Sequence, residues 1–200
     1  MLLVSNRGRA GSRDTRKHPF IEILDGLKYV RAQPTVYALI LLSIVPFMFG
    51  MPLNTLLPAF NEDILLGGPA DLGVLLSAMG VGAILGSLML AASGDLKHKG
   101  TWLVITCFGW GVATVLFGMA PNLWTAVVVL ALVGWLSSWN MSLNRGLLQV
   151  QVERRMRGRI MSIDMMSHGL MPLGVIPISL IAEAYDVAVA LVCAGIAFGI

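Results

Sequence analysis

Long apolar segments alternate with short polar connections along this chain. A helix needs about 20 apolar residues to cross a bilayer core about 30 Å thick, and several runs here reach that length. Backbone polar groups inside a bilayer must be satisfied within the segment, which favours helices. The pattern therefore predicts membrane-spanning helices over residues 35–57, 72–92, 101–119, 123–143, 160–182 and an incomplete one over 187–200.

The sixth apolar segment is shorter than the other five. As a helix, residues 187–200 would rise only about 21 Å, which is less than the thickness of the bilayer core. We therefore expect an all-α integral membrane protein whose last helix is truncated, so that the chain is an incomplete fragment.

Lys and Arg are confined to alternate connections. They occur before residue 35, at Lys97 and Lys99, and again over residues 154–159, whereas the connections over residues 58–71, 120–122 and 183–186 have none. Cytoplasmic loops carry the excess of Lys and Arg, so the pattern predicts a multi-pass protein of the cell (inner) membrane with a cytoplasmic N-terminus. The net charge of +3 then reflects topology and does not indicate nucleic-acid binding.

Three regions follow from this pattern. Residues 1–18 are predicted to be a basic, flexible cytoplasmic leader, and Met1 to Val4 is too short for the apolar core of a signal peptide. Residues 19–33 repeat apolar side chains at helical spacing, with charged residues between them, as a helix on the inner membrane surface requires. Residues 34–200 are predicted to form the transmembrane bundle.

Composition supports the same class of protein. Hydrophobic residues make up 56% of the chain and charged residues only 12%, which is more apolar surface than a soluble domain of 200 residues can hide. Cys107 and Cys193 lie inside apolar segments without metal-ligand spacing, so we expect neither a metal site nor a cofactor.

Small residues and prolines indicate how the helices pack. Gly82 and Gly86 are four residues apart in the second span, which predicts a face where another helix approaches closely. With Gly80 they do not match the spacing of a dinucleotide-binding loop. Four prolines in the first and fifth spans are placed to bend their helices: Pro46, Pro52, Pro172 and Pro177.

The fourth span carries polar side chains at helical spacing. Ser137, Asn140 and Asn144 fall on one face, with Arg145 beside them near the end that we expect to be cytoplasmic. One interpretation is a hydrophilic stripe that lines a substrate pathway, and the other is hydrogen bonding between helices. Arg145 is expected to extend to the inner interface.

The fifth span contains Asp164 and His168, four residues apart and therefore expected on one helix face. Counted from Ile160, they lie about 6 Å and about 12 Å into the span. A carboxylate paired with an imidazole at low dielectric can exchange a proton near neutral pH, as a proton-coupled transporter needs. The alternative is a locally satisfied pair that only orders the helix.

Several sequence stretches resemble the major facilitator superfamily, and within it the branch of enterobactin-exporter-like efflux proteins, also called transmembrane secretion effectors. The resemblance runs from about Pro19 to the end of the chain. It is carried by residues 157–162 and 169–174, with support from residues 26–31, 57–60 and 79–86.

The resemblance implies a fold of twelve helices in two six-helix halves, of which this chain would supply the C-terminal half. A missing N-terminal half is then an expected partner, beside the lipid bilayer, a small-molecule substrate and protons. The third span would be a peripheral, lipid-facing helix, and the fourth and fifth would line the central cavity. Such carriers export drug-like or siderophore-like molecules by alternating access and proton antiport.

The resemblance also suggests a cytoplasmic gate. Residues 91–100 match a gate loop of the superfamily in part, since they keep Asp95 but lack the first glycine and the arginine of that pattern. We expect Asp95, Arg157 and Arg159 to serve the inner gate.

The sequence also bears on two other classes of membrane protein. An intramembrane protease needs a nucleophile with a partner base. Ser167 and His168 are sequence neighbours whose side chains point apart on a helix, and no Gly-x-Ser-x-Gly turn occurs, so we do not expect an enzyme. A channel-like or non-transporting membrane protein that acts as an oligomer fits the helix count equally well and stays an open alternative.

Overall fold

The computed structural model describes residues 19–94 and 96–199, apart from the side chains of residues 19–25, 47, 167, 168 and 199. Nearly all of these residues are helical and none forms a strand, which confirms the predicted all-α membrane fold. The predicted leader over residues 1–18 lies outside the described residues.

The first span contains two breaks in its α-helical hydrogen bonding. It consists of α2 (Pro34–Val45), the π-helical turn η1 (Pro46–Gly50), α3 (Pro52–Ala59) and the π-helical turn η2 (Phe60–Ile64). A proline lacks an N–H and crowds the preceding turn, so the regular α-helix gives way at Pro46 and resumes at Pro52. The α-helix is thus interrupted at the two prolines where the sequence predicts a bend, and the whole segment Pro34–Ile64 is longer than the predicted residues 35–57.

Four further segments are long and apolar enough to cross a membrane. They are α4 (Pro69–Ala92), α5 (Lys99–Gly118), α6 (Leu123–Gln151) and the combined α7 (Arg157–Ser167), η3 (His168–Leu170) and α8 (Met171–Ala184). The described part of the last helix, α9 (Val187–Gly199), is shorter. α6 continues past the predicted end at residue 143 because a helix does not stop where its side chains become polar.

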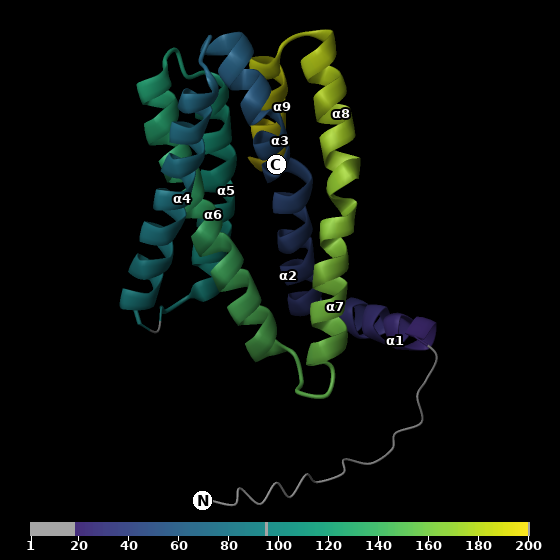
Figure 1. The fold of residues 1–200 in the computed structure, drawn as a ribbon. Coiled ribbons are helices and arrows are strands. Elements are labelled where there is room, and N and C mark those ends of the chain that lie inside the picture. The colour runs from purple at the N-terminus through teal and green to yellow at the C-terminus, as the bar shows by residue number, and fades with distance from the viewer. Residues whose placement is uncertain (1–18, 95, 200) are drawn as a thin grey trace, which may run out of the picture.

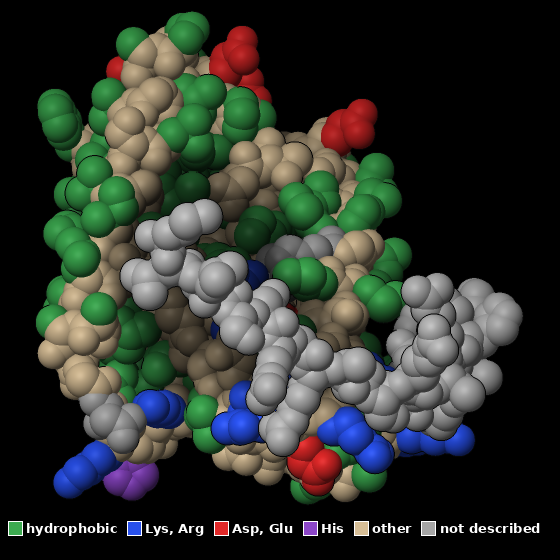
Figure 2. Space-filling model, turned by 60° about the horizontal axis from the view of Figure 1, so that its bottom comes forward, with side chains coloured by type: hydrophobic (Ala, Val, Ile, Leu, Met, Phe, Trp, Pro, Cys, Tyr) green, Lys and Arg blue, Asp and Glu red, His purple; other side chains and the backbone are tan. Residues whose placement is uncertain are grey.

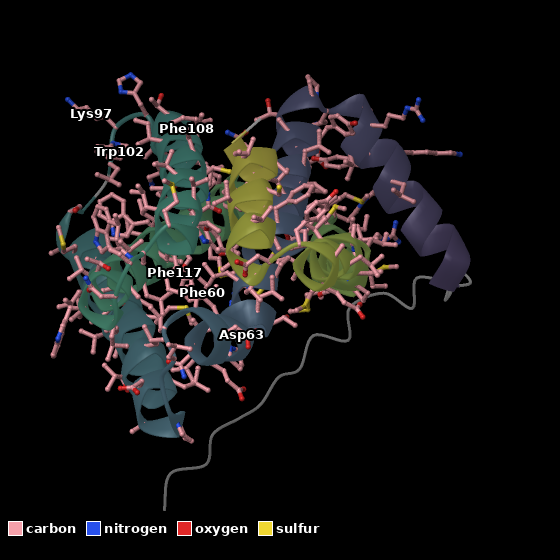
Figure 3. The ribbon with its side chains drawn as sticks, turned by 90° about the horizontal axis from the view of Figure 1, so that it is seen from above. Phe60, Asp63, Lys97, Trp102, Phe108 and Phe117 are labelled. Carbon is pink, nitrogen blue, oxygen red and sulfur yellow. The ribbon has the colours of Figure 1, made fainter. Side chains whose placement is uncertain are left out.

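The helices form a bundle with one element lying across its end (Figure 1). α1 (Pro19–Ala32) runs across the lower end, where it contacts α2 and α7. α6 packs against α4 and α5, and α9 packs between α5 and α8, as the view from above also shows (Figure 3). α2 contacts both α6 and α7, and it so joins the side of the bundle formed by α4, α5 and α6 to the side formed by α7 and α8.

Glycines allow α4 and α6 to approach closely, as the sequence predicts. A Cβ atom at Gly82 would overlap the carbonyl oxygen of Ala131, and one at Gly134 would overlap that of Met79. At Gly86 a Cβ would lie 2.8 Å from the carbonyl oxygen of Trp135. This close packing also brings the indole of Trp139 to Gly86, where Nε1 donates a hydrogen bond of 2.6 Å to the carbonyl oxygen.

Side chains from several helices fill the interior. The rings of Phe60 and Phe117 contact each other at a tilt of 39°, with centroids 4.6 Å apart (Figure 3). A second cluster, around Val36, Trp139 and Ile160, joins the lower parts of α2, α6 and α7. These contacts hold the two sides of the bundle together next to the polar residues described below.

Burial differs strongly between the spans. In the most apolar part of α4 only 17% of residues are buried, and in that of α7–α8 only 12%, against 44% for α5. α5 has an outward face that includes Phe108 and an inward face that packs on α6 and α9, so it is not the most exposed helix. The largest unpartnered apolar faces within the described residues therefore belong to α4 and α7–α8.

Charged side chains gather at opposite ends of the bundle (Figure 2). Most Lys and Arg lie at the end that carries α1, and most acidic side chains lie at the other end, where η2 contains Glu62 and Asp63 and α8 ends next to Glu183. Glu153, in the connection between α6 and α7, belongs to the basic end. The alternation of charge along the sequence therefore becomes a separation of charge along the bundle.

Substituting Gly82 by Ala should destabilise the protein, because the new methyl group overlaps backbone atoms of α6. We expect a loss of about 1–3 kcal/mol, which is typical of overpacking. Gly80→Ala is the matched control, since a Cβ there meets nothing within 4 Å, and it should leave stability unchanged or raise it by up to about 1 kcal/mol. Thermal unfolding in detergent checks this, and equal melting temperatures for the two variants would contradict the packing.

Candidate functional site

Three spans contribute polar side chains to one small cleft, whose open volume of about 10 Å³ has room for little more than a water molecule. Ser43 comes from α2, Asn140 and Asn144 from α6, and Asp164 from α7. Pro46, Met141 and Arg145 complete the lining. The structure thus brings Asp164, the predicted proton-coupling carboxylate, into the same cleft as two of the predicted substrate-pathway residues.

Asp164 is buried and accepts a hydrogen bond from a side chain of another span. Its carboxylate is 2% exposed, and Ser43 Oγ donates a hydrogen bond of 2.5 Å to Asp164 Oδ1. A carboxylate in a membrane span is costly unless it is paired or faces the interior of the protein. The bond to Ser43 supplies such a partner and connects the first span to the fifth.

Sequence reasoning missed Ser43. Its hydroxyl group is a single polar side chain within the apolar run of residues 36–49, three residues before Pro46. An isolated hydroxyl beside a helix break is a detectable signal, but hydroxyls in helices often bond to their own backbone, so it did not indicate a partner on another span.

Asn140 connects two helices. It is 1% exposed, and its Nδ2 donates to the carbonyl oxygen of Leu103 at 3.3 Å and to Thr106 Oγ1 at 3.4 Å, both on α5. These bonds realise the second interpretation, hydrogen bonding between helices, for the amide nitrogen of Asn140. The residue also lines the cleft, so the first interpretation is not excluded.

Asn144 differs from Asn140 in its hydrogen bonding. It is 4% exposed, and its Oδ1 is buried without a hydrogen-bond partner among the described residues. A buried unsatisfied acceptor costs about 1–3 kcal/mol, which is a reason to look for a ligand. Arg145, the next residue, is exposed and lines the same cleft.

Ser137 lies in a different cavity. Its hydroxyl donates to the carbonyl oxygen of Gly134 in the preceding turn at 2.9 Å. The cavity that it lines is formed by the first span, α4, α5 and α6, and it also contains Asn54 and Trp110. Trp110 Nε1 is buried without a hydrogen-bond partner in the described ranges, and sequence reasoning did not single it out. The predicted polar stripe is thus divided: Ser137 lines this cavity, whereas Asn140 and Asn144 line the cleft.

The side chain of His168 lies outside the described residues. Its backbone begins the 3₁₀ turn η3, directly after α7 ends at Ser167. A spacing of four residues places two side chains on one face of a continuous α-helix. Here the α-helix of Asp164 ends at Ser167 and a 3₁₀ turn begins at His168, so this expectation does not apply directly. Their pairing stays a prediction.

The predicted gate residues lie around the end that carries α1. Asp95 lies outside the described residues. Arg157 is exposed, and its Nε donates to the carbonyl oxygen of Val152 at 3.2 Å, which closes the connection between α6 and α7. Arg159 is half-buried one turn before Ile163, near Gly26 of α1.

No cluster of His, Cys, Asp and Glu that could hold a metal ion occurs among the described residues. The chemistry of the cleft therefore consists of a carboxylate, a hydroxyl group and two carboxamides next to an arginine. Such a set contains both donors and acceptors of hydrogen bonds.

Comparisons with known proteins agree with the resemblance seen in the sequence. The profile of the family described as transmembrane secretion effector matches residues 2–200. Enterobactin exporters EntS from Shigella boydii serotype 18, Shigella boydii serotype 4 and Escherichia coli O1:K1 are each 34% identical to this chain over 148 residues. Each match covers 72% of this chain and 34% of the relative, so the matched region is about a third of these relatives' length. No solved structure matches.

Asn140 and Asn144 provide a matched pair for a test of the two interpretations. Asn140→Leu should lower the free energy of unfolding by about 1 kcal/mol, because the bonds to α5 are lost. Asn144→Leu removes a group without a partner at Oδ1 and should leave stability unchanged or raise it. Thermal melting in detergent checks this, and a larger loss for Asn144→Leu than for Asn140→Leu would show that the hydrogen bonding is assigned wrongly.

Proposed function

Since the chain belongs to the family of transmembrane secretion effectors, within the major facilitator superfamily of transporters, we propose that it forms part of a proton-coupled exporter of a small molecule. The family consists of transporters and not of enzymes. The named relatives are enterobactin exporters, which supports a siderophore-like or drug-like cargo. Export powered by proton antiport is the proposal for the complete carrier.

The observation that carries this proposal is the buried carboxylate of Asp164 in a cleft shared by three spans. An ionisable side chain inside a membrane span is a candidate for proton transfer, and we assign this role to Asp164. A proton on Asp164 adds a hydrogen-bond donor to a cleft in which Asn144 Oδ1 lacks one. The cleft is too small for a substrate in this conformation, so the proposal includes its opening during the transport cycle, when proton uptake and substrate binding would compete for the same polar groups. His168 is proposed as the second residue of this proton-coupling pair.

The remaining roles follow from this placement. We assign Asn140 and Asn144 in the cleft, and Ser137 in the neighbouring cavity, to the substrate pathway. Asp95, Arg157 and Arg159 are assigned to the cytoplasmic gate, at the end that carries α1. The apolar faces of α4 and α7–α8 are available to an N-terminal six-helix half.

Membrane placement is part of the proposal. Residues 1–18 form the cytoplasmic leader, residues 19–33 lie on the inner surface of the cell membrane, and residues 34–200 form the transmembrane bundle. The gathering of Lys and Arg at one end of the bundle supports a cytoplasmic location for that end (Figure 2).

Asp164→Asn in the complete transporter should abolish export driven by a pH gradient, because a carboxamide does not take up and release a proton as a carboxylate does. Substrate efflux from proteoliposomes, measured with and without an imposed gradient, checks this. Glu183→Gln is the matched control, since Glu183 lies on the same span but is exposed at its far end, and it should retain pH-driven export. An unchanged pH dependence in Asp164→Asn would remove this carboxylate from the coupling scheme.

Counterflow separates a carrier from the channel-like alternative. In vesicles loaded with unlabelled substrate, a carrier accumulates labelled substrate transiently above its external concentration, because each transport cycle exchanges one molecule for another. The complete protein should show this overshoot. Equilibration without an overshoot would indicate a pore and contradict the proposed mechanism.

A further inference from the structure

A groove lies where α1 meets α2, away from the cleft. It is lined by the last two turns of α1 and the first turn of α2, through Leu27, Lys28, Val30, Arg31, Pro34 and Tyr37. None of these residues has a part in the proposed transport pathway.

Packing fixes both walls of the groove. Val30 on α1 and Val36 on α2 are 5% and 0% exposed, and both belong to the lower core cluster. Gly26 rests on α7, since a Cβ there would lie 2.8 Å from Ile163 Cδ1. The chain turns between the two helices at Gln33, whose N–H bonds to the carbonyl oxygens of Tyr29 and Val30 at 3.2 Å each. The groove is therefore a built feature of the fold.

The lining combines two cations with apolar surface. Lys28 and Arg31 are exposed, and neither forms an ion pair with a carboxylate whose side chain the structure describes, a set that leaves out Glu22 and Asp25. Leu27 and Tyr37 are large side chains that are each 50% exposed, although they flank a core. Cations beside exposed aliphatic and aromatic surface suit a ligand that has an anionic head and an apolar chain.

The position of the groove fits such an amphiphile. Pro34 is the first residue of the first membrane span, so the groove lies where the polar part of the chain meets the bilayer. α1 lies across the end of the bundle here (Figure 1). Tyr37 sits one turn inside the span, which is the depth that aromatic side chains favour at a membrane interface.

We propose that this groove binds one anionic phospholipid of the membrane, with its phosphate on Lys28 and Arg31 and the start of an acyl chain on Leu27 and Tyr37. A free phosphate ion would contact the two cations but would not contact the apolar side chains. The bound lipid would hold α1 at the mouth of the bundle, next to the first turn of α7.

Binding of fluorescent phosphatidylglycerol to the full, delipidated chain in neutral detergent tests this. Lys28→Ala/Arg31→Ala should weaken binding at least about tenfold, since each basic residue near a membrane surface contributes substantially to anionic-lipid affinity. Lys97→Ala/Arg154→Ala is the matched control, because it removes two exposed cations elsewhere at the same end of the bundle, and it should change affinity less than about twofold.

Two further measurements use the apolar wall and the unmodified chain. Leu27→Ser/Tyr37→Ser keeps both cations and should also weaken phosphatidylglycerol binding several-fold. The unmodified chain should bind phosphatidylcholine of the same acyl composition at least about tenfold more weakly than phosphatidylglycerol. Inorganic phosphate at millimolar concentration should not displace the lipid.

Three results would overturn the proposal. Equal losses in the two cation pairs would show non-specific attraction between the basic end and any anionic lipid. Efficient displacement by inorganic phosphate would show a simple anion site. Equal binding of phosphatidylglycerol and phosphatidylcholine by the unmodified chain would show that the charge of the lipid is not recognised, whatever the variants do.

Discussion

A bilayer core offers no hydrogen-bond partners, so each polar group of a spanning helix has to find one inside the protein. The hydroxyls of Thr114 and Ser137 bond to their own helices. Where a group cannot be satisfied locally, it bonds to another span: Trp139 to Gly86, Asn140 to α5, and Asp164 to Ser43. These bonds between spans fix which helices are neighbours, and the last of them joins the two sides of the bundle at the cleft.

The same constraint explains why the cleft is the place to look for function. Asn144 Oδ1 has no partner among the described residues although it is buried, and it shares the cleft with a buried carboxylate. Polar and ionisable side chains inside a membrane span are costly, so their gathering in one cleft motivates the assignment of function there. The helix breaks lie close by, since η1 begins at Pro46, which lines the cleft, and η3 follows α7 on the facing span. Breaks of this kind give the spans places to bend as a carrier changes conformation.

Sequence predicted the elements better than their contacts. The apolar runs located the spans, and Gly82 and Gly86 identified the face of α4 that meets α6, because a small-residue pattern is a local signal with one physical meaning. The helices of α6 and of the first span extend beyond the predicted membrane spans, because hydropathy marks the apolar part of a helix and not its ends. Asn140 and Asp164 were found because polar residues are conspicuous in apolar runs. Their hydrogen-bond partners on α5 and α2 were not predicted, because a bond between spans depends on how the helices pack, and residue spacing along the chain does not show this.

The central claim is that Asp164 takes up a proton inside the cleft. Infrared difference spectroscopy of the reconstituted complete transporter, titrated between alkaline and acidic pH, detects this directly through the carbonyl stretch of a protonated carboxyl group. The account predicts a band that appears on acidification, is lost in Asp164→Asn, persists in Glu183→Gln and is diminished when substrate is added. Identical titration spectra for the unmodified protein and Asp164→Asn would contradict it.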